Sequence, residues 1–232
     1  FVGKNSSKLH LTRTKLMWHE LLRTCTNGSS ELVTNISLSL VCMLYNVQLL
    51  KIAGQNGVAA YGVIMYVNFI FISIYLGYSF GTAPIVAFNY GARNTAELQN
   101  VLKKSLKLLL GAGITLTAVA MLLSASLSKI FVGYDAELYA MTVKGFRLYA
   151  VSYLLSGFNI YGSSFFTALN NGLVSAVISF LRTVVFEVAF IMILPMFFGL
   201  DGIWCAIIVA ELSALLITAV FFFRLRGKYD YI

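Results

Sequence analysis

The chain has 232 residues, of which 59% are hydrophobic and only 11% charged, and its formal net charge at pH 7 is +8. Soluble globular domains carry roughly 25% charged residues, so this composition excludes an ordinary soluble domain and indicates an integral membrane protein. No basic groove with interleaved aromatic residues and no nucleic-acid-binding motif accompanies the positive charge. We therefore expect the charge to orient the chain in a membrane and to attract anionic lipid, and we expect no nucleic-acid partner.

Residues 1–27 form a basic, amphipathic lead-in to the membrane. They lack the ordered charged, apolar and cleavage regions of a signal peptide. The stretch KLMWHELLRTCT (15–26) is typical of a helix that lies on the membrane surface. His10 and His19 have no further ligand at metal spacing, so we expect surface side chains and no metal site. Because the chain opens with Phe1, we expect it to be part of a longer protein.

Apolar windows follow, each long enough for a helix that crosses the roughly 30 Å hydrocarbon core of a membrane. Six are present within residues 28–223, and a basic tail of residues 224–232 ends the chain. The windows cover residues 29–50, 58–87, 105–127, 146–169, 173–198 and 202–223. The sequence thus predicts an all-α integral membrane protein, built as a bundle of six transmembrane helices.

Lysine and arginine residues predict the orientation of these helices. The lead-in, the connection after the second window and the C-terminal tail fall on one side of the membrane, and they carry most of the positive charge. The other side has Lys51, Lys129, Lys144 and Arg147. Because cytoplasmic segments carry the excess of lysine and arginine, both ends of this segment are predicted to be cytoplasmic, in a multi-pass protein of the plasma (cytoplasmic) membrane.

The first window begins with NGSSE, which places Glu31 in its first helical turn. A carboxylate there suits the partly positive helix end. Glu31 is also a plausible proton or ion ligand at the cytoplasmic entrance, and the two explanations are compatible. One helical face carries Glu31, Asn35, Ser39, Cys42 and Asn46. We expect that polar face to avoid lipid.

Polar faces recur in the second and fourth windows. One explanation is that such residues join helices by hydrogen bonds and close approach. The other is that three such faces line one cavity, since aromatic faces with amides suit large cationic or amphipathic guests. The candidate cavity residues are Asn35, Asn68, Tyr75, Ser156, Asn159 and Ser163.

The second window is longer than a membrane requires and ends in FGTAPIVAFNYGARN. Proline inside a helix removes a backbone hydrogen bond, and glycine permits bending. We therefore expect Gly81 and Pro84 to bend this helix or to end it early. Gly81 and Gly91 are candidate hinge positions.

Charged side chains inside the membrane cost about 2.5 to 3.5 kcal/mol each by insertion scales, so they usually have a partner or a task. Arg182 and Glu187 lie in the fifth window and Glu211 lies in the sixth. Residues five positions apart are about 140° apart around an α-helix, so Arg182 is expected to pair with Glu211.

Glu187 would then be left without a cation, and such a carboxyl takes up a proton more readily than one in water. Either the cluster is a structural ion pair beside a silent, protonated glutamate, or the excess carboxyl carries a proton during transport. The candidate ion-coupling residues are Glu31, Arg182, Glu187 and Glu211.

Patterns of catalysis and cofactor binding are absent from the sequence. It has no HExxH, GxSxG, P-loop or dinucleotide-binding pattern, and Cys25, Cys42 and Cys205 are too far apart to indicate a disulfide or zinc framework. We therefore predict a protein that is not an enzyme and has no cofactor.

Three stretches carry a resemblance to a known family. They are NGSSE (27–31), GVAAYGVIMYVNF (57–69) and GTAPIVAFNYGA (81–92), the last of which contains Gly81, Pro84, Asn89 and Gly91. Over nearly all residues after the lead-in, the chain resembles the second half of a multidrug and toxic compound extrusion (MATE) transporter. The resemblance implies a twelve-helix exporter of two six-helix lobes, with the other lobe before Phe1. It also implies exchange of protons or sodium ions for cationic, aromatic drugs by alternating access.

In some members of that family, carboxylates in the first and fourth helices of this lobe bind the cation. Glu31 is in the first helix here, but the fourth helix has no acidic residue. This departure favours protons, carried by Glu187, Glu211 or a carboxylate of the preceding lobe, and it leaves sodium open. One alternative function is a flippase of lipid-linked saccharides, which should have more cavity arginine and lysine. Another is a non-transporting membrane fragment.

Overall fold

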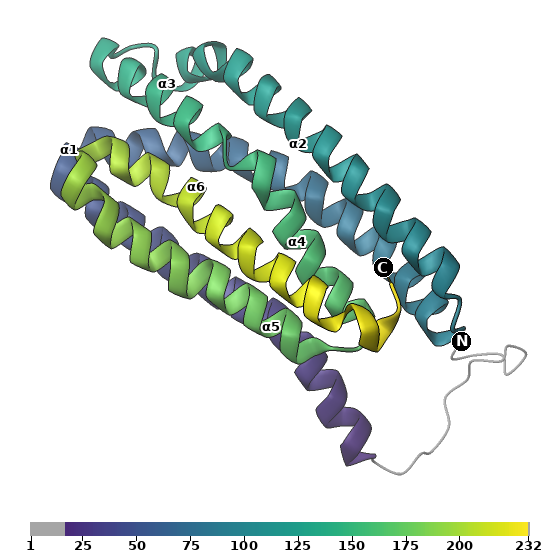
Figure 1. Ribbon diagram of the computed structural model, residues 1–232. Coiled ribbons are helices and arrows are strands. Elements are labelled where there is room, and N and C mark those ends of the chain that lie inside the picture. Colours follow the sequence, from purple (N-terminus) through teal and green to yellow (C-terminus); the bar gives the residue numbers. More distant parts are fainter. Residues whose placement is uncertain (1–16, 232) are drawn as a thin grey trace, which may run out of the picture.

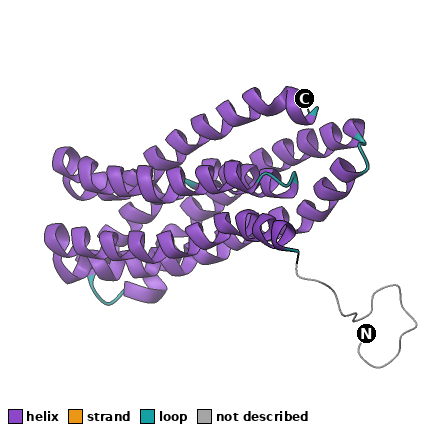
Figure 2. Ribbon diagram, turned by 90° about the horizontal axis from the view of Figure 1, so that it is seen from below, coloured by secondary structure: helices purple, strands orange, loops and turns teal. Residues whose placement is uncertain are grey.

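The computed structural model describes residues 17–231, without the side chains of residues 27, 29–31, 33 and 34. This described part is helical throughout and its helices are joined by short turns (Figure 2). The elements are α1 (Trp18–Gly91), α2 (Thr95–Val132), α3 (Ala136–Ala150), α4 (Tyr153–Ala168), α5 (Gly172–Phe180), the π-helix η1 (Leu181–Phe186) and α6 (Glu187–Tyr229).

Two glycines divide the longest helices. Gly54 within α1 has φ 63° and ψ −152°, and Gly199 within α6 has φ 55° and ψ −132°. Side chains with a Cβ rarely adopt this positive-φ region, so only glycine reverses the chain there without strain. Figure 1 shows the chain turning back at the end of the bundle where each break lies.

These reversals produce the predicted bundle. Three stretches are long and apolar enough to cross a membrane: Asn35–Gly91, Thr95–Val132 and Gly172–Tyr229. At about 1.5 Å per residue, an unbroken helix of the first length would extend about 85 Å, nearly three times the hydrocarbon thickness. The breaks at Gly54 and Gly199 make two passes from each of the outer stretches. With α2 and with α3 followed by α4, the described chain crosses the bundle six times, as predicted.

Side-chain caps explain where three of the helices begin. Asn94 accepts a hydrogen bond from the backbone N–H of Glu97 at the start of α2 (3.2 Å). Asp135 accepts from the N–H groups of Glu137 (2.9 Å) and Leu138 (3.0 Å) at the start of α3. Asn171 caps α5 in the same way. Each cap satisfies N–H groups that a helix leaves unbonded at its first turn.

The first helix differs from the sequence-based expectation at both ends. α1 begins at Trp18 and runs without a break into the first pass, so the lead-in is not a separate helix where the structure describes it. Of the two outcomes expected at Gly81 and Pro84, a bend or an early end, the early end does not occur, because α1 continues to Gly91.

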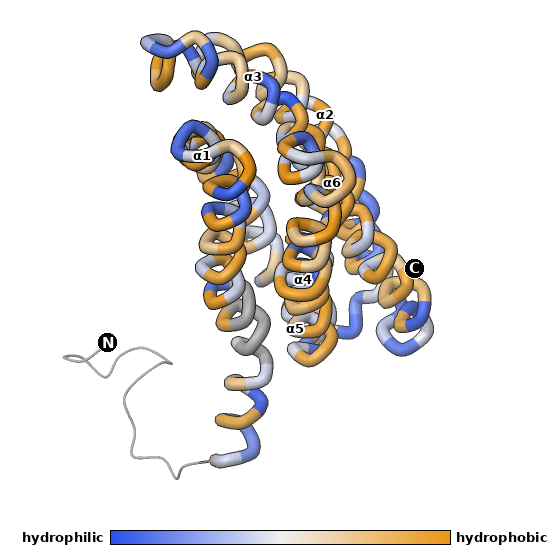
Figure 3. The backbone as a smooth tube through the Cα atoms, turned by 90° about the vertical axis from the view of Figure 1, so that its left-hand side faces the viewer, coloured by the Kyte–Doolittle hydropathy of each residue, from blue (hydrophilic) through white to orange (hydrophobic). Residues whose placement is uncertain are grey.

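The centre of the bundle is α4, which packs against α1, α2, α5 and α6. Glycine allows close approaches of these helices: a Cβ at Gly157 would lie 2.6 Å from the ring of Tyr75. Large apolar side chains also cover the outside, where Leu122 is 79% exposed and Met196 is 81% exposed. Figure 3 shows hydrophobic positions along the helices and hydrophilic ones largely near the turns, as a membrane bundle requires.

Candidate functional site

A buried ion pair lies where α4, η1 and α6 meet. The Nη2 atom of Arg182 lies 2.5 Å from Oε1 of Glu211, and its Nε atom lies 3.0 Å and 3.1 Å from the two carboxylate oxygens. Glu211 is only 1% exposed. The contact expected between Arg182 and Glu211 is therefore present, in the bidentate geometry that makes such pairs strong.

Two residues of α4 complete the surroundings of Glu211. Ser156 Oγ donates to Oε1 (2.9 Å), and Asn159 Nδ2 donates to Oε2 (2.6 Å) and to the Glu211 carbonyl oxygen (2.9 Å). Thr218 Oγ1 in turn donates to Oδ1 of Asn159 (3.2 Å). Both carboxylate oxygens thus accept from the guanidinium and from a neutral donor, which suits an ionised carboxylate, since that group only accepts.

The π-helix brings Glu187 closer to Arg182 than α-helical spacing implies. The backbone N–H of Glu187 donates to the carbonyl oxygen of Arg182, five residues earlier. Residues joined by such a bond are one turn apart, so the expected separation of about 140° is wrong for this segment. Glu187 interacts electrostatically with both Arg182 and Glu211. Within residues 17–231, however, it forms no salt bridge.

Tyrosines surround Glu187 on its other sides. Tyr45 and Tyr61 of α1 and Tyr149 of α3 all have Glu187 among their electrostatic neighbours. The rings of Tyr45 and Tyr61 are stacked, with centroids 4.8 Å apart. Tyr45 is 1% exposed, and its hydroxyl has no hydrogen-bond partner in the described part of the chain. Sequence analysis missed Tyr45, because this residue lies outside the polar face of the first window.

Several residues expected to line a cavity form hydrogen bonds that join helices. Tyr75 is buried and its hydroxyl donates to the carbonyl oxygen of Tyr153 (2.7 Å). Ser163 shares hydrogen bonds with Ser175 (2.8 Å) and Ser179 (2.9 Å), which join α4 to α5. Asn159 is fully buried against Glu211. For these residues the hydrogen-bonding explanation of the polar faces applies within this bundle.

The remaining cavity candidates lie on α1. Asn68 is partly buried and Asn35 is exposed. None of the six candidates lines the pocket between the two passes of α1, the pocket at Pro84 or the two pockets beside α2 and α6. Glu31 also lies within α1, but its side chain is outside the part that the structure describes.

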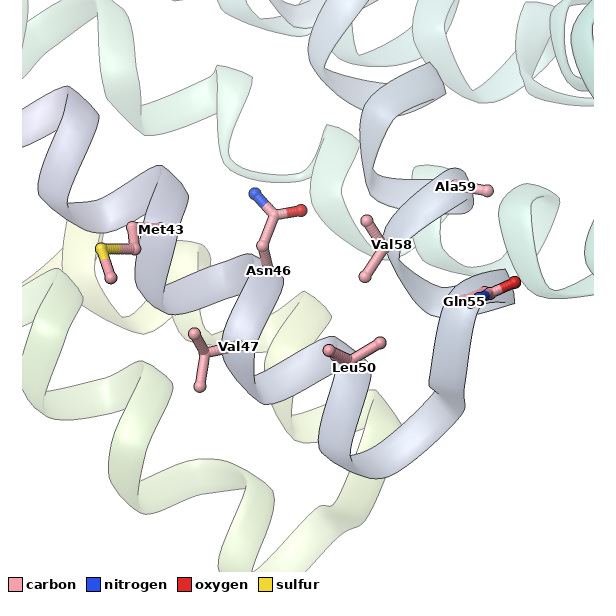
Figure 4. A pocket seen from close by; sticks show the side chains of 7 residues that line it. All are labelled: Met43, Asn46, Val47, Leu50, Gln55, Val58 and Ala59. Carbon is pink, nitrogen blue, oxygen red and sulfur yellow. The ribbon is translucent and has the colours of Figure 1, made fainter.

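A pocket of about 560 Å³ lies between the two passes of α1 (Figure 4). Most of its lining is apolar, and the amides of Asn46 and Gln55 supply its polar groups. The lining residues are Met43, Asn46, Val47, Leu50, Gln55, Val58 and Ala59. Asn46 is the last residue of the polar face predicted for the first window. An apolar pocket with a few amides suits an amphipathic guest.

A second pocket of about 560 Å³ includes Pro84 and runs between α1 and α4. Of the other motif residues, Asn89 is 7% exposed and donates to the carbonyl oxygen of Ile85 (2.9 Å). A Cβ added at Gly81 or at Gly91 would meet nothing within 4 Å, so packing does not explain either glycine. Within residues 17–231 the three cysteines are free, and no group of three or more potential ligands could hold a metal ion.

Comparisons with known proteins add a family and a fold. A family model named MatE matches residues 32–193. The outward-facing conformation of a multidrug resistance MATE family transporter of the MOP superfamily aligns with a TM-score of 0.87 and 20% identity, over 99% of this chain and 52% of that one. A crystal structure of MATE in the bent conformation aligns with a TM-score of 0.88 and 20% identity, over 98% of this chain and 51% of that one.

A third structure is similar in fold and different in its described role. A MOP superfamily transporter from Pyrococcus furiosus aligns with a TM-score of 0.83 and 21% identity, over 91% of this chain and 48% of that one. Its description states that the reversed polarity of its binding pocket suggests a different function. The chain spans about half the length of these structures, which corresponds to one lobe. The comparison with curated protein sequences produces no match.

Proposed function

The chain belongs to the MatE family of membrane transporters, and on that premise we propose that it forms one lobe of a secondary active multidrug exporter. In this proposal protons enter the cell as cationic or amphipathic aromatic compounds leave it. A preceding six-helix lobe supplies the other wall of the transport cavity. The chain lies in the plasma membrane with both of its ends in the cytoplasm, as the distribution of lysine and arginine favours.

The charge balance of the buried cluster carries this proposal. Arg182 contributes one positive charge, whereas Glu187 and Glu211 contribute two carboxyl groups. Glu211 already accepts from Arg182 and two neutral donors, so Glu187 is the group with room for a proton. One proton on Glu187 makes the whole cluster neutral, and a neutral cluster costs less to keep inside a membrane.

Coupling requires that Glu187 has different surroundings in the two access states, because a ligand moves an equilibrium only by its differential affinity. The segment η1 supports such a change. Short π-helical segments occur frequently at functional sites, and a return of residues 181–186 to α-helical spacing would turn Glu187 away from Arg182. Similar transporters have been observed in outward-facing and inward-facing conformations.

Sodium is the second candidate ion, and the tyrosines favour it. The hydroxyl oxygens near Glu187 are hard ligands of the kind that alkali cations accept, and the Tyr45 hydroxyl has no partner in the described structure. Sodium would bind Glu187 in the place of the proton. The coupling role of Glu187 is common to both versions.

The guest binds on the α1 side of the lobe in this proposal. The pocket formed by Met43, Asn46 and Gln55 lies toward the outer end of these passes, next to Lys51, and offers apolar contacts and amide groups to an aromatic cation on its way out of the cell. Glu31, at the other end of the first pass, remains a candidate ion ligand at the cytoplasmic entrance. Gly81 and Gly91 remain candidate hinge positions.

Everted membrane vesicles that contain the protein with its preceding lobe provide the test. A proton gradient is established, a pH-reporting dye is followed as ethidium is added, and the experiment is repeated with sodium. We expect ethidium to collapse the gradient with the native protein and not with Glu187→Gln. Glu137→Gln is the matched control, because Glu137 is acidic, exposed and outside the cluster. Undiminished exchange in Glu187→Gln would refute the coupling role of Glu187, whereas exchange that depends only on sodium would favour the second candidate ion.

A further inference from the structure

A groove runs along the outside of the bundle between α2 and α6. Both helices pack against α4, but they do not pack against each other. In Figure 1, α4 lies between them. The groove encloses a pocket of about 210 Å³ with Phe158 of α4 in its lining. Its walls are Leu102 and Leu106 on α2 and Leu215, Thr218, Ala219, Phe222 and Phe223 on α6. Such a lining suits an acyl chain.

A polar pocket of about 360 Å³ lies on the same helix faces, beyond the end of this groove. On α2, Thr95 and Leu98 line the polar pocket and are followed at spacings of four residues by Leu102 and Leu106 of the groove. On α6, Leu215 and Phe222 line the groove, and Tyr229 lies seven residues further along the same face. Residues at these spacings share one side of a helix, so the apolar groove continues into the polar pocket.

The polar pocket has the charges of a phosphate site. Arg93 and Lys228 both line it, and Lys228 Nζ lies 5.1 Å from the ring centre of Tyr229. Asp230 also lines the pocket, so its two cations exceed the carboxylate by one charge. A carboxylate beside cations accepts hydrogen bonds from hydroxyl groups, such as those of a glycerol headgroup.

The position of the pocket matches the surface of a membrane. Tyr90 and Tyr229 line it, and tyrosine is enriched where helices pass from hydrocarbon to headgroups. Basic pockets between transmembrane helices bind the headgroups of anionic lipids. The apolar groove lies on the membrane side of the polar pocket. This arrangement matches a phospholipid, whose acyl chains lie in the membrane and whose phosphate lies at its surface.

We propose that this composite site binds one anionic phospholipid, with its phosphate at Arg93 and Lys228 and an acyl chain between α2 and α6. The occupied groove would bridge α2 and α6 directly. In the described structure these two helices are connected through α1, α3 and α4, which contact both, and through the hydrogen bond from Gln99 Nε2 to the Asp230 carbonyl oxygen (3.2 Å). The groove also reaches Thr218, whose hydroxyl bonds Asn159 beside Glu211. The site is independent of the coupling ion and of the exported compound.

The test uses the protein purified in nonionic detergent and titrated with dioleoyl phosphatidylglycerol or dioleoyl phosphatidylcholine, with bound lipid counted by native mass spectrometry. We expect phosphatidylglycerol to bind about tenfold tighter or more, because each cation near a headgroup contributes substantially to such binding. The double variant Arg93→Gln/Lys228→Gln should lose that preference. Ala219→Trp, which fills the groove, should lower the occupancy of both lipids.

Arg226→Gln is the matched control for Lys228→Gln. Arg226 has the same charge at the same end of α6, but it does not line the polar pocket and lies two positions from Lys228, on the opposite side of the helix. We expect Lys228→Gln to weaken phosphatidylglycerol binding severalfold and Arg226→Gln to leave it unchanged. A thermal unfolding midpoint for each variant shows whether the protein is folded. If the double variant is unfolded, the Lys228→Gln variant decides the question.

Three results would overturn the proposal. Equal binding of the two lipids, or an unchanged preference in the folded charge variants, would show that the cations do not select a headgroup. Displacement of phosphatidylglycerol by an equal concentration of glycerol 3-phosphate would show a site for a soluble anion. Loss of a dimer in Ala219→Trp, without loss of lipid, would show that the groove holds a second copy of the chain.

Discussion

The stability of the bundle should depend strongly on Arg182. In Arg182→Gln, Glu211 stays buried but loses the cation whose two nitrogen atoms lie 2.5 to 3.1 Å from its oxygens. Removal of one partner of a buried ion pair costs about 3 to 5 kcal/mol, because the remaining charge is uncompensated. We therefore expect Arg182→Gln to lower the free energy of unfolding by about that amount, measured by denaturant titration in mixed micelles.

A second variant separates the loss of the pair from the loss of packing. In Arg182→Gln/Glu211→Gln the neutral amide oxygen can accept from Asn159 and the amide NH2 group can donate to the Ser156 hydroxyl, so most of the lost free energy should return. Lys144→Gln is the matched control, since it breaks the Lys144–Asp201 pair (2.6 Å), whose side chains are 62% and 44% exposed. An exposed pair of this kind is worth about 0 to 1 kcal/mol.

A loss of unfolding free energy in Arg182→Gln no larger than that in Lys144→Gln would refute this role of Arg182. A double variant less stable than Arg182→Gln would refute it as well. In either case the guanidinium would not be the main partner of the buried carboxylate.

Three further substitutions test the tyrosine beside Glu187 and two glycines of the bundle. Tyr45→Phe removes a buried hydroxyl without a described partner, so unfolding measurements should show unchanged or slightly raised stability. If that hydroxyl interacts with Glu187 during transport, the vesicle assay should show altered coupling in this variant. Gly54→Ala should cost about 1 to 3 kcal/mol in the same unfolding assay, because φ is 63° there, and a loss no larger than that of Gly81→Ala would contradict this. Gly157→Ala would place a Cβ 2.6 Å from the Tyr75 ring, so a lower unfolding midpoint is expected, and an unchanged one would show that the ring moves aside freely.

The passes of the chain could be predicted from the sequence because their cause is local. An apolar window of about 20 residues must form its own backbone hydrogen bonds in a membrane, so its position alone predicts a helix. The depth of each residue also follows from its distance to the helix end, which is why Arg182 and Glu211 could be paired across two passes. Proline did not end the helix at Pro84, because the pass continues through it to Gly91.

The contacts around the cluster required the tertiary structure. Local sequence does not reveal the π-helical turn that places Glu187 near Arg182, and Tyr45 is too remote in sequence for any spacing to pair it with Glu187. Nor could the polar face of the fourth window distinguish a cavity wall from the hydrogen-bonding role that Asn159 has at Glu211.

The sequence by itself determined that this protein is a bundle of membrane-crossing helices, how many times it crosses, and that charges lie at matching depths. The tertiary structure alone decided which helix faces meet, which hydroxyls and amides serve Glu211, and where α2 and α6 leave a groove. The physical reason is the solvent. Lipid is as apolar as leucine, so a helix in a membrane has no polar outer face, and its sequence carries little periodic signal to show which side packs inward.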